Sequence, residues 1–280
     1  MQMYLPFGLG LGVWGAAAAT AIAQMVSFGI VVFYYSSGRS PVRLRFRNLR
    51  PRVSVLGKIS AIGSSSFALQ CAASVVQIAA NVQLANYGGD LAISAMTLVN
   101  SIGLFCIMPI IGINQGIQPI VGYNYGAKNY GRVRSAYFFA VAVASVLTIT
   151  AGILLQFFPQ QIVSLFNEDA ELVSITSKAL RLTMLMMPFI GFQIVSANFF
   201  QFIGKAFVSL VMTLLRQIIL LIPLFFILPN YFGLNGIFIA SAASDAISVF
   251  ITAAVISREL LWLTRKIREQ KIHYVNVGLD

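Results

Sequence analysis

Long apolar stretches alternate with short polar connections along most of the chain. Residues 59–89, 135–158 and 182–204 contain no Asp, Glu, Lys or Arg. A helix that crosses a bilayer needs roughly 20 predominantly apolar residues. Backbone groups in hydrocarbon must also bond within the protein, which favours helices. The pattern therefore predicts about seven transmembrane helices, at residues 10–35, 55–85, 91–117, 135–158, 172–202, 206–228 and 233–260.

The composition supports an all-α integral membrane protein. The chain of 280 residues is 58% hydrophobic and only 10% charged, with a mean hydropathy of +0.84. A soluble domain is nearer one half apolar and one quarter charged. The net charge of +11 does not indicate a nucleic-acid partner, because the basic residues occupy short stretches between apolar spans.

The basic residues alternate with the predicted spans. They follow the first, third, fifth and seventh spans, whereas the connections at 86–90, 158–171 and 229–232 contain none. Because Lys and Arg are enriched in cytoplasmic loops, we expect a multi-pass protein of the cell membrane with its N-terminus outside and its C-terminus in the cytoplasm. The bases that follow these spans are Arg39, Arg43, Arg45, Arg47, Arg50, Arg52, Lys58, Lys128, Arg132, Arg134, Lys205, Arg258, Arg265, Lys266, Arg268 and Lys271.

The residues typical of metal centres and nucleophilic catalysis are scarce. Cys71 and Cys106 both lie inside apolar spans, and His273 is the one histidine. Cysteine in such a setting is usually a small buried hydrophobe. We therefore expect no metal site, no cofactor and no enzymatic activity.

A short motif recurs near the two ends of the chain. Gly12 and Gly15 are followed by Ala19 and Ala21, and the same spacing appears in Gly233, Gly236, Ala240 and Ala242. Five predicted spans separate the two copies, so the first span corresponds to the seventh. Parallel six-helix repeats are a known transporter design, although small-residue helix starts are also common in membranes for packing reasons alone.

A denser motif begins within the end of the third span and continues beyond it. The sequence at 112–128 reads GINQGIQPIVGYNYGAK and is followed by Arg132 and Arg134. It resembles a signature of the multidrug and toxic compound extrusion (MATE) family. Segments 10–20, 180–205, 214–224 and 243–247 also resemble successive helices of that family, so the resemblance covers nearly the whole chain before about residue 265.

The resemblance implies a twelve-helix transporter with two six-helix lobes that face each other across a cavity. Residues 1–38 would be the last helix of the first lobe, 39–54 a basic cytoplasmic linker, 55–264 a complete second lobe, and 265–280 a basic cytoplasmic tail. The expected activity is secondary active export of small amphipathic or cationic compounds. Its partners would be these compounds, membrane lipids and a missing N-terminal lobe, so the chain would be a C-terminal fragment of the transporter.

The coupling ion stays open between a proton and sodium. Sodium-linked members often carry acidic residues in the first and fourth helices of the second lobe. Span 55–85 has none, and 172–202 has only Glu171 just outside its end. Other members place the key aspartate in the first lobe.

Several uncharged polar residues share one face of the second span. Their intervals of three and four residues place them on one side of a helix. A polar stripe should face protein or water rather than lipid, which indicates either a substrate cavity or hydrogen bonding between helices. With the adaptable methionines and Gln193 of the fifth span, where ordinary packing is the alternative for the methionines, the cavity candidates are Ser66, Gln70, Ser74, Gln77, Asn81, Met184, Met187 and Gln193.

The signature itself combines helix-weakening and amide residues. Prolines and glycines loosen a helix end, and amide side chains can bond the backbone groups that a broken helix exposes. The segment is either a cytoplasmic hinge or a tight helix–loop junction. Its candidate residues are Pro109, Gly112, Asn114, Gln115, Gly116, Gln118, Pro119, Gly122, Asn124 and Gly126.

Two charges lie near the middle of predicted spans. Arg216 is central in 206–228 and Asp245 is central in 233–260. A charge at the bilayer centre costs roughly 2.5–3.5 kcal/mol on insertion scales, so such residues normally face the interior and pair. Antiparallel neighbouring helices would place the two at similar depth. We expect a structural ion pair, with a proton relay through Asp245 as the alternative.

Three other functions share part of the pattern. A lipid-linked oligosaccharide or lipid II flippase has a related fold, but its cavity is typically rich in basic residues, and here only Arg216 is deep. A seven-helix receptor fits the span count, but span 233–260 lacks the lysine that a retinal protein needs. A non-functional gene fragment is the third alternative.

Overall fold

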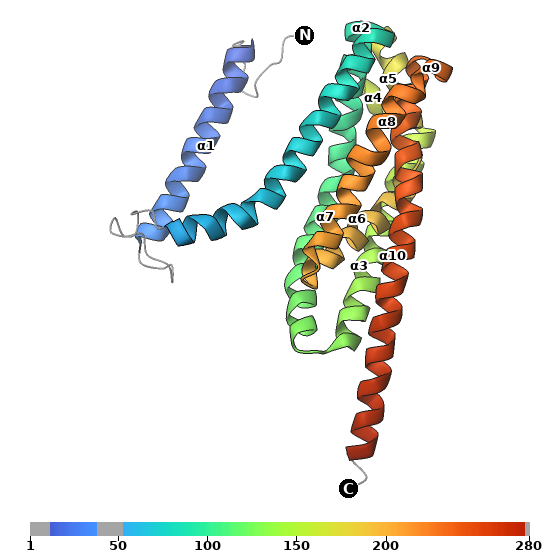
Figure 1. Cartoon of the computed structure of the whole chain (residues 1–280). Coiled ribbons are helices and arrows are strands. Elements are labelled where there is room, and N and C mark those ends of the chain that lie inside the picture. The colour runs from blue at the N-terminus through green and yellow to red at the C-terminus, as the bar shows by residue number, and fades with distance from the viewer. Residues whose placement is uncertain (1–11, 38–52, 278–280) are drawn as a thin grey trace. The chain divides into compact units, whose positions relative to one another are not determined.

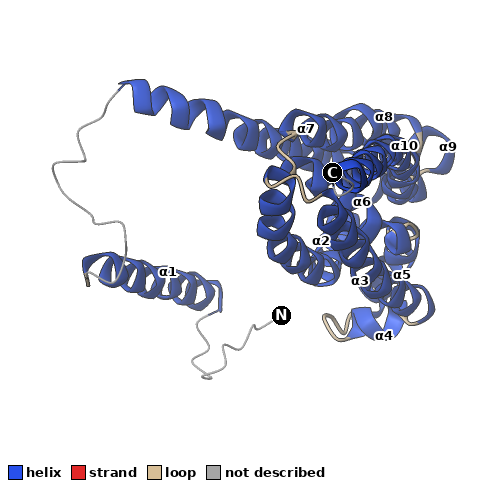
Figure 2. Ribbon diagram, turned by 90° about the horizontal axis from the view of Figure 1, so that it is seen from below, coloured by secondary structure: helices blue, strands red, loops and turns tan. Residues whose placement is uncertain are grey.

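The computed structural model describes residues 12–37 and 53–277, and its regular secondary structure in these ranges is entirely helical (Figure 2). This confirms the all-helical fold class. Most of the linker predicted at 39–54 lies outside the described residues. The side chain of Ser66 and the side chains beyond Gln270 lie outside them as well. Of the described residues, five helices are long and apolar enough to cross a membrane, and a bent pair makes a sixth.

The chain forms two compact units, Met1–Gly63 and Ser64–Asp280. In the first unit, helix α1 (Gly12–Ser36) covers the first predicted span. Its apolar side chains are exposed, Phe28 and Phe33 among them. A helix with this surface is suited to contact with lipid or with another apolar partner.

Helix α2 (Val53–Gly126) contains the second and third predicted spans in one element. Gly89 interrupts it with a positive φ of 60° and ψ of −157°, a conformation that residues with a Cβ rarely adopt. Figure 1 shows α2 reversing its direction at its upper end. The structure thus places helix on both sides of the connection expected at 86–90.

The structure corrects the expected end of the third span. The predicted span ends at residue 117, but α2 continues through Pro119 to Gly126. The reason is that Ile110, Ile117 and Val121 continue one buried face at helical spacing. The connection to the next helix is only Ala127–Asn129, where Lys128 has a positive φ of 58°.

The following helices are α3 (Tyr130–Phe157), a short α4 (Pro159–Ser164), α5 (Ala170–Thr183) and α6 (Met187–Phe202). Helices α5 and α6 make the fifth predicted span, with a bend of 53° between them. Pro188 lies in the first turn of α6, where its missing N–H is tolerated. Helix α5 begins at Asp169, whose carboxylate accepts the backbone N–H groups of Glu171 and Leu172.

The last two spans are one composite helix and one long helix. The first consists of α7 (Ala206–Leu214), the π-helical segment η2 (Leu215–Leu221), α8 (Ile222–Ile227) and the single turn α9 (Pro229–Phe232). Gly233, with φ 56°, ends this run. Helix α10 (Leu234–Val277) then continues beyond the predicted span end at 260 and through much of the expected tail.

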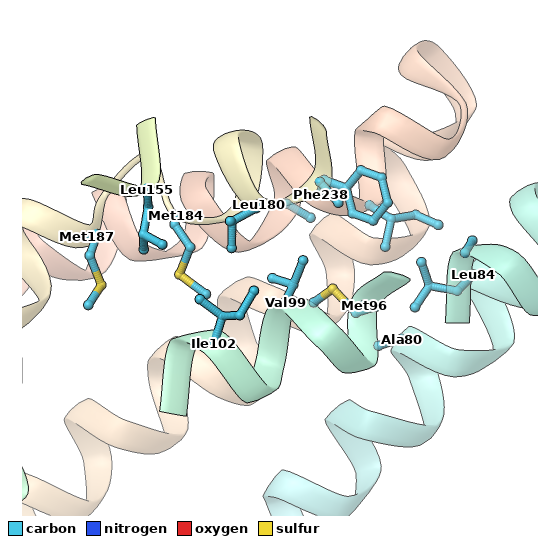
Figure 3. Packing of buried hydrophobic residues seen from close by; sticks show 14 of the residues in the cluster. Ala80, Leu84, Met96, Val99, Ile102, Leu155, Leu180, Met184, Met187 and Phe238 are labelled. Atoms are coloured by element: carbon cyan, nitrogen blue, oxygen red, sulfur yellow. The ribbon is translucent and has the colours of Figure 1, made fainter. Parts of the chain in front are cut away.

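Two apolar clusters hold the second unit together. One includes Met96, Leu180, Met187 and Phe225, together with parts of α10, and Figure 3 shows part of it. The other includes Tyr137 and Phe199 and lies around the end of α2 and the beginning of α3. Helices α3 and α6 pack closely, and Tyr137 shares a hydrogen bond of 2.8 Å with Ser196 there. Members of both clusters line the candidate site, Met96 and Phe225 from the first and Met212 from the second.

The basic connections of the second unit lie at one of its ends, and the connections without basic residues lie at the other. Gln270 donates a hydrogen bond to the Lys128 carbonyl, which joins the end of α10 to the basic connection after α2. At the other end, Tyr87 donates to the side-chain oxygen of Asn230. Figure 1 shows the α2–α3 connection and the C-terminal part of α10 below, with α4 and α9 above.

Candidate functional site

An ion pair joins the two central charges. The Nε of Arg216 donates to Oδ1 of Asp245 at 2.5 Å. The Asp245 side chain is only 6% exposed, whereas that of Arg216 is 34% exposed. A buried carboxylate requires a partner because its desolvation cost is otherwise uncompensated. The structure thus contains the pair that the sequence predicts.

The local backbone sets the position of Arg216. It is the second residue of η2, and Pro223 follows this segment closely. A π-helical turn is wider than an α-helical turn and occurs often at functional sites. Pro223 has no N–H to donate to the preceding helical turn. Its position is therefore consistent with the end of the π-helical segment at Leu221. Asp245 projects from the regular helix α10 on the opposite side of the pair.

A cavity of about 260 Å³ opens beside the ion pair. Its apolar lining comes from several of the elements around it and includes Met184, which extends towards Ile102 of α2 (Figure 3). The Met184 methyl packs against Gly103, 2.7 Å from the position that a Cβ would take there. Its polar lining consists of Gln77, Asn100, Thr183, Arg216, Ser241, Ser244 and Asp245. We call this space the larger cavity.

A second cavity, of about 190 Å³, is also lined by Arg216. Gln193 lines it and donates a 2.5 Å hydrogen bond to Ser248. Its other polar lining residues are Asn198, Thr213, Arg216, Ser248 and Thr252. We call this space the smaller cavity. Arg216 lines both cavities, whereas Asp245 lines only the larger one.

The predicted cavity residues divide into several groups. Gln77 and Met184 line the larger cavity and Gln193 lines the smaller one. Asn81 accepts a hydrogen bond from Gln77 at 3.0 Å. Met187 is fully buried in the apolar cluster.

The start of the predicted polar stripe is exposed. Ser74 donates to the Gln70 carbonyl of its own helix, and both side chains are exposed. The side chain of Ser66 lies outside the described residues. The stripe therefore reaches the larger cavity only at its C-terminal end.

The signature residues lie at the end of α2, away from both cavity linings. Asn124 is buried and donates to the Ile120 carbonyl. Asn114 is also buried, and neither of its side-chain amide atoms has a partner among the described residues. A Cβ on Gly122 would contact the Phe202 carbonyl at 3.5 Å. The hinge role stays a prediction for this segment, whose remaining members Pro109, Gly112, Gln115, Gly116, Gln118, Pro119 and Gly126 are exposed.

Helix α10 has a second polar face that was not predicted from the sequence. Ser241, Asp245, Ser248 and Thr252 follow one another at helical spacing on α10 and line the two cavities. The spacing of these hydroxyl residues around Asp245 was the signal that could have found them. Hydroxyl residues are common in membrane helices for packing, so the pattern is distinctive only once the aspartate is taken as its centre.

A second ion pair was also missed. Lys205, between α6 and α7, bonds both carboxylate oxygens of Glu259 at 2.7 Å. Its ammonium also lies 5.5 Å from the ring centroid of Trp262, which contacts Tyr125 and Tyr130. This group ties the end of α2 to α10. Among the described residues, no three His, Cys, Asp or Glu side chains cluster as a metal site would require.

Comparison with known proteins identifies related sequences and structures. Residues 66–227 match the profile of the MatE family. The chain is 25% identical over 239 residues to the multidrug export protein MepA of Staphylococcus saprophyticus, an alignment that covers 85% of this chain and 52% of that protein. The chain therefore spans about half the length of the curated relatives it matches.

Solved structures share the same fold. The MATE multidrug transporter DinF-BH superposes with a TM-score of 0.75 at 38% identity, over 90% of this chain and 56% of that one. An inward-facing MATE family transporter superposes with a TM-score of 0.80 at 22% identity, over 94% of this chain and 61% of that one.

Proposed function

Because the chain belongs to the MATE family of helical membrane proteins, we propose that it forms the second lobe of a secondary active antiporter, together with one helix of the first lobe. The transported compounds are small and amphipathic, and often cationic. Three observations support this proposal: the family match over residues 66–227, the 38% identity to a multidrug transporter, and a span of about half of the MepA relatives.

The larger cavity is the proposed substrate site. It combines apolar and thioether groups with amides and one carboxylate, that of Asp245. Methionine adapts to ligands of different shape, and most ligand sites combine an apolar lining with a few convergent polar groups. A cationic amphiphile would place its apolar body against Met184 and its charge towards Asp245.

The energy source in this proposal is a proton or sodium gradient, with no resident cofactor. Asp245 is one candidate for proton exchange, because protonation would release Arg216 from the ion pair. Span 55–85 contains no Asp or Glu and offers no acidic ligand for sodium. A flippase of lipid-linked oligosaccharides is less well supported, because its cavity is typically rich in basic residues, whereas Arg216 is the one basic residue among the described residues that line the larger cavity.

The proposed location is the plasma membrane, with the N-terminus outside and the C-terminus in the cytoplasm. The contacts support a common side for the basic connections, since Gln270 bonds Lys128 at one end and Tyr87 bonds Asn230 at the other. The positive-inside rule then assigns the basic end to the cytoplasm.

The proposal is tested by export of a fluorescent cationic dye from cells that produce the chain with a matching first lobe. Met184→Trp should fill the larger cavity and lower export strongly. Met108→Trp is the matched control, because Met108 is 54% exposed on α2 and does not line either cavity. Equal export by the two variants, at equal amounts of folded protein, would remove the larger cavity from the transport route.

A further inference from the structure

The guanidinium of Arg216 uses only part of its hydrogen-bonding capacity. Its Nε donates to Asp245, and among the described residues its two terminal nitrogens make no hydrogen bond. An arginine offers five N–H donors in a planar fork that matches carboxylate and phosphate geometry. The donors on the terminal nitrogens therefore remain available beside the two cavities.

The smaller cavity has the electrostatic character of an anion site. Among the described residues, Arg216 is the only charged one that lines it. The rest of its polar lining consists of amides and hydroxyls, which can donate hydrogen bonds to an oxyanion. Thr252 is 2% exposed there. Gln193 is 5% exposed, and its Nε2 donates to Ser248.

The position of Asp245 makes the charges that line the two cavities different. Its carboxylate lines only the larger cavity, whereas Arg216 lines both. A group in the smaller cavity is therefore next to Arg216, the positive partner of the pair, whereas Asp245, the negative partner, does not line that cavity. We propose that the smaller cavity is an oxyanion subsite, which binds the carboxylate of a small amphipathic compound through the terminal nitrogens of Arg216.

The subsite broadens the substrate class beyond cations. A carboxylate that accepts two charge-assisted hydrogen bonds from Arg216 gains orientation as well as affinity. Compounds that carry both an ammonium and a carboxylate could place the first near Asp245 and the second in the smaller cavity. That the bound compound is transported rests on the proposed function, whereas the binding itself does not.

Binding to the purified chain in phosphatidylcholine nanodiscs tests the subsite. The probe is dansylglycine, and its neutral counterpart of nearly equal size is dansylglycinamide. One hydrogen bond to a charged group is worth about tenfold in affinity, so the carboxylate should bind about tenfold more tightly than the amide. Equal affinities would overturn the proposal.

Variants of the ion pair test whether the charge of Arg216, rather than the shape of the cavity, determines dansylglycine binding. Asp245→Asn keeps a hydrogen-bond acceptor for Arg216 but removes the competing negative charge, so dansylglycine affinity should rise about tenfold. The double variant Arg216→Gln/Asp245→Asn leaves no unpaired charge, which favours folding, and it should bind the two probes equally. A retained preference for the carboxylate in the double variant would place the anion elsewhere and overturn the assignment.

A matched pair of threonine variants locates the subsite. Thr252→Val removes a hydroxyl from the smaller cavity, and Thr183→Val makes the same change in the larger one. The first should weaken dansylglycine binding about threefold, as expected for the loss of one weaker hydrogen bond, and the second should leave it unchanged. The reverse order would assign the carboxylate to the larger cavity and contradict the proposal.

Two further arms separate related outcomes. If phosphatidylglycerol in the nanodiscs abolishes dansylglycine binding in the unmodified chain but not the residual binding of the double variant, the oxyanion subsite stands and a lipid headgroup is its occupant. If the completed protein fails to export dye while the carboxylate preference persists, the proposed function fails and the subsite stands. Dye export without any carboxylate preference would support the proposed function and overturn the subsite.

Discussion

At the scale of single residues, the Arg216–Asp245 pair illustrates how the bilayer constrains a sequence. An isolated charge near mid-membrane is costly, so the presence of two opposite charges in adjacent spans is enough to predict their contact. The structure adds the burial of each side chain, which the two charges alone do not predict. Asp245 is almost fully buried, whereas Arg216 is one third exposed and lines two cavities.

Because the two charges pair, the losses of stability caused by removing each one should not add in the double variant. We expect Arg216→Leu and Asp245→Leu each to reduce stability by about 3 kcal/mol, because each leaves an uncompensated charge, as in other broken buried pairs. The double Leu variant should be closer to the unmodified chain than either single variant. Folded yield in detergent, measured by size-exclusion chromatography, is the readout, and additive losses would contradict the pairing.

The residues of the site were only partly predictable. Gln77, Met184 and Gln193 line the cavities as the polar and methionine patterns suggest, because a polar side chain in a membrane helix must face protein or water. Asn100, Ser244 and Thr252 were not predicted, since which hydroxyl or amide reaches a cavity depends on how helices rotate against one another. Hydrophobic patterns fix this rotation poorly when a helix is apolar on all sides.

At the scale of elements, the positions of the membrane spans were predictable, whereas several helix ends and interruptions were not. Bilayer thickness imposes spans of roughly 20 residues, so α1, α3 and the core of α10 lie where the hydropathy places them. The π-helical segment at Arg216 leaves no local signal in composition, because it depends on tertiary contacts. The single glycine at 89 interrupts α2, yet Gly116 continues the same helix without a break.

The contact between α3 and α6 gives the sharpest prediction at this scale. A Cβ on Gly191 would lie 2.7 Å from the Ala144 carbonyl and from Oγ1 of Thr148. Gly191→Ala should therefore separate the two helices and cost about 1–3 kcal/mol, as overpacking of a core does. The readout is the temperature at which the detergent-solubilised protein aggregates.

A matched glycine provides the control for this change. A Cβ on Gly116 would meet nothing within 4 Å, and Gly116 lies within the helical part of α2. Gly116→Ala should leave the aggregation temperature unchanged or raise it, because alanine favours helix by about 0.5–1 kcal/mol over glycine. Similar losses for the two variants would show that the close approach at Gly191 does not limit stability.

At the scale of the whole molecule, we predict the orientation in the membrane from the charge distribution of the second unit. We expect Ala127→Cys, in the basic α2–α3 connection, to react with an impermeant maleimide only after cells are permeabilised. Leu165→Cys, which lies between α4 and α5 and is 83% exposed, should react in intact cells. Both changes are made after Cys71 and Cys106 are replaced by Ala, and the opposite labelling pattern would reverse the orientation.

The largest consequence of the fold concerns what the chain can do alone. Alternating access requires two repeats that rock against each other around a central site. The described second unit supplies the lining of both cavities from residues 76–252, and the chain spans about half of its curated relatives. We therefore expect the 280-residue chain alone to export no fluorescent cationic dye above the level of cells without it.

Completion of the transporter should restore export. Co-production of a matching first lobe supplies the second repeat, so dye export should appear only in cells that contain both parts. Membrane levels of the chain, compared by immunoblotting, serve as the control for unequal production. Strong export by the chain alone would contradict the half-transporter interpretation. It would instead require a homodimer in which two second lobes face each other, and cross-linking of Cys71, which is exposed on α2, would then report on that dimer.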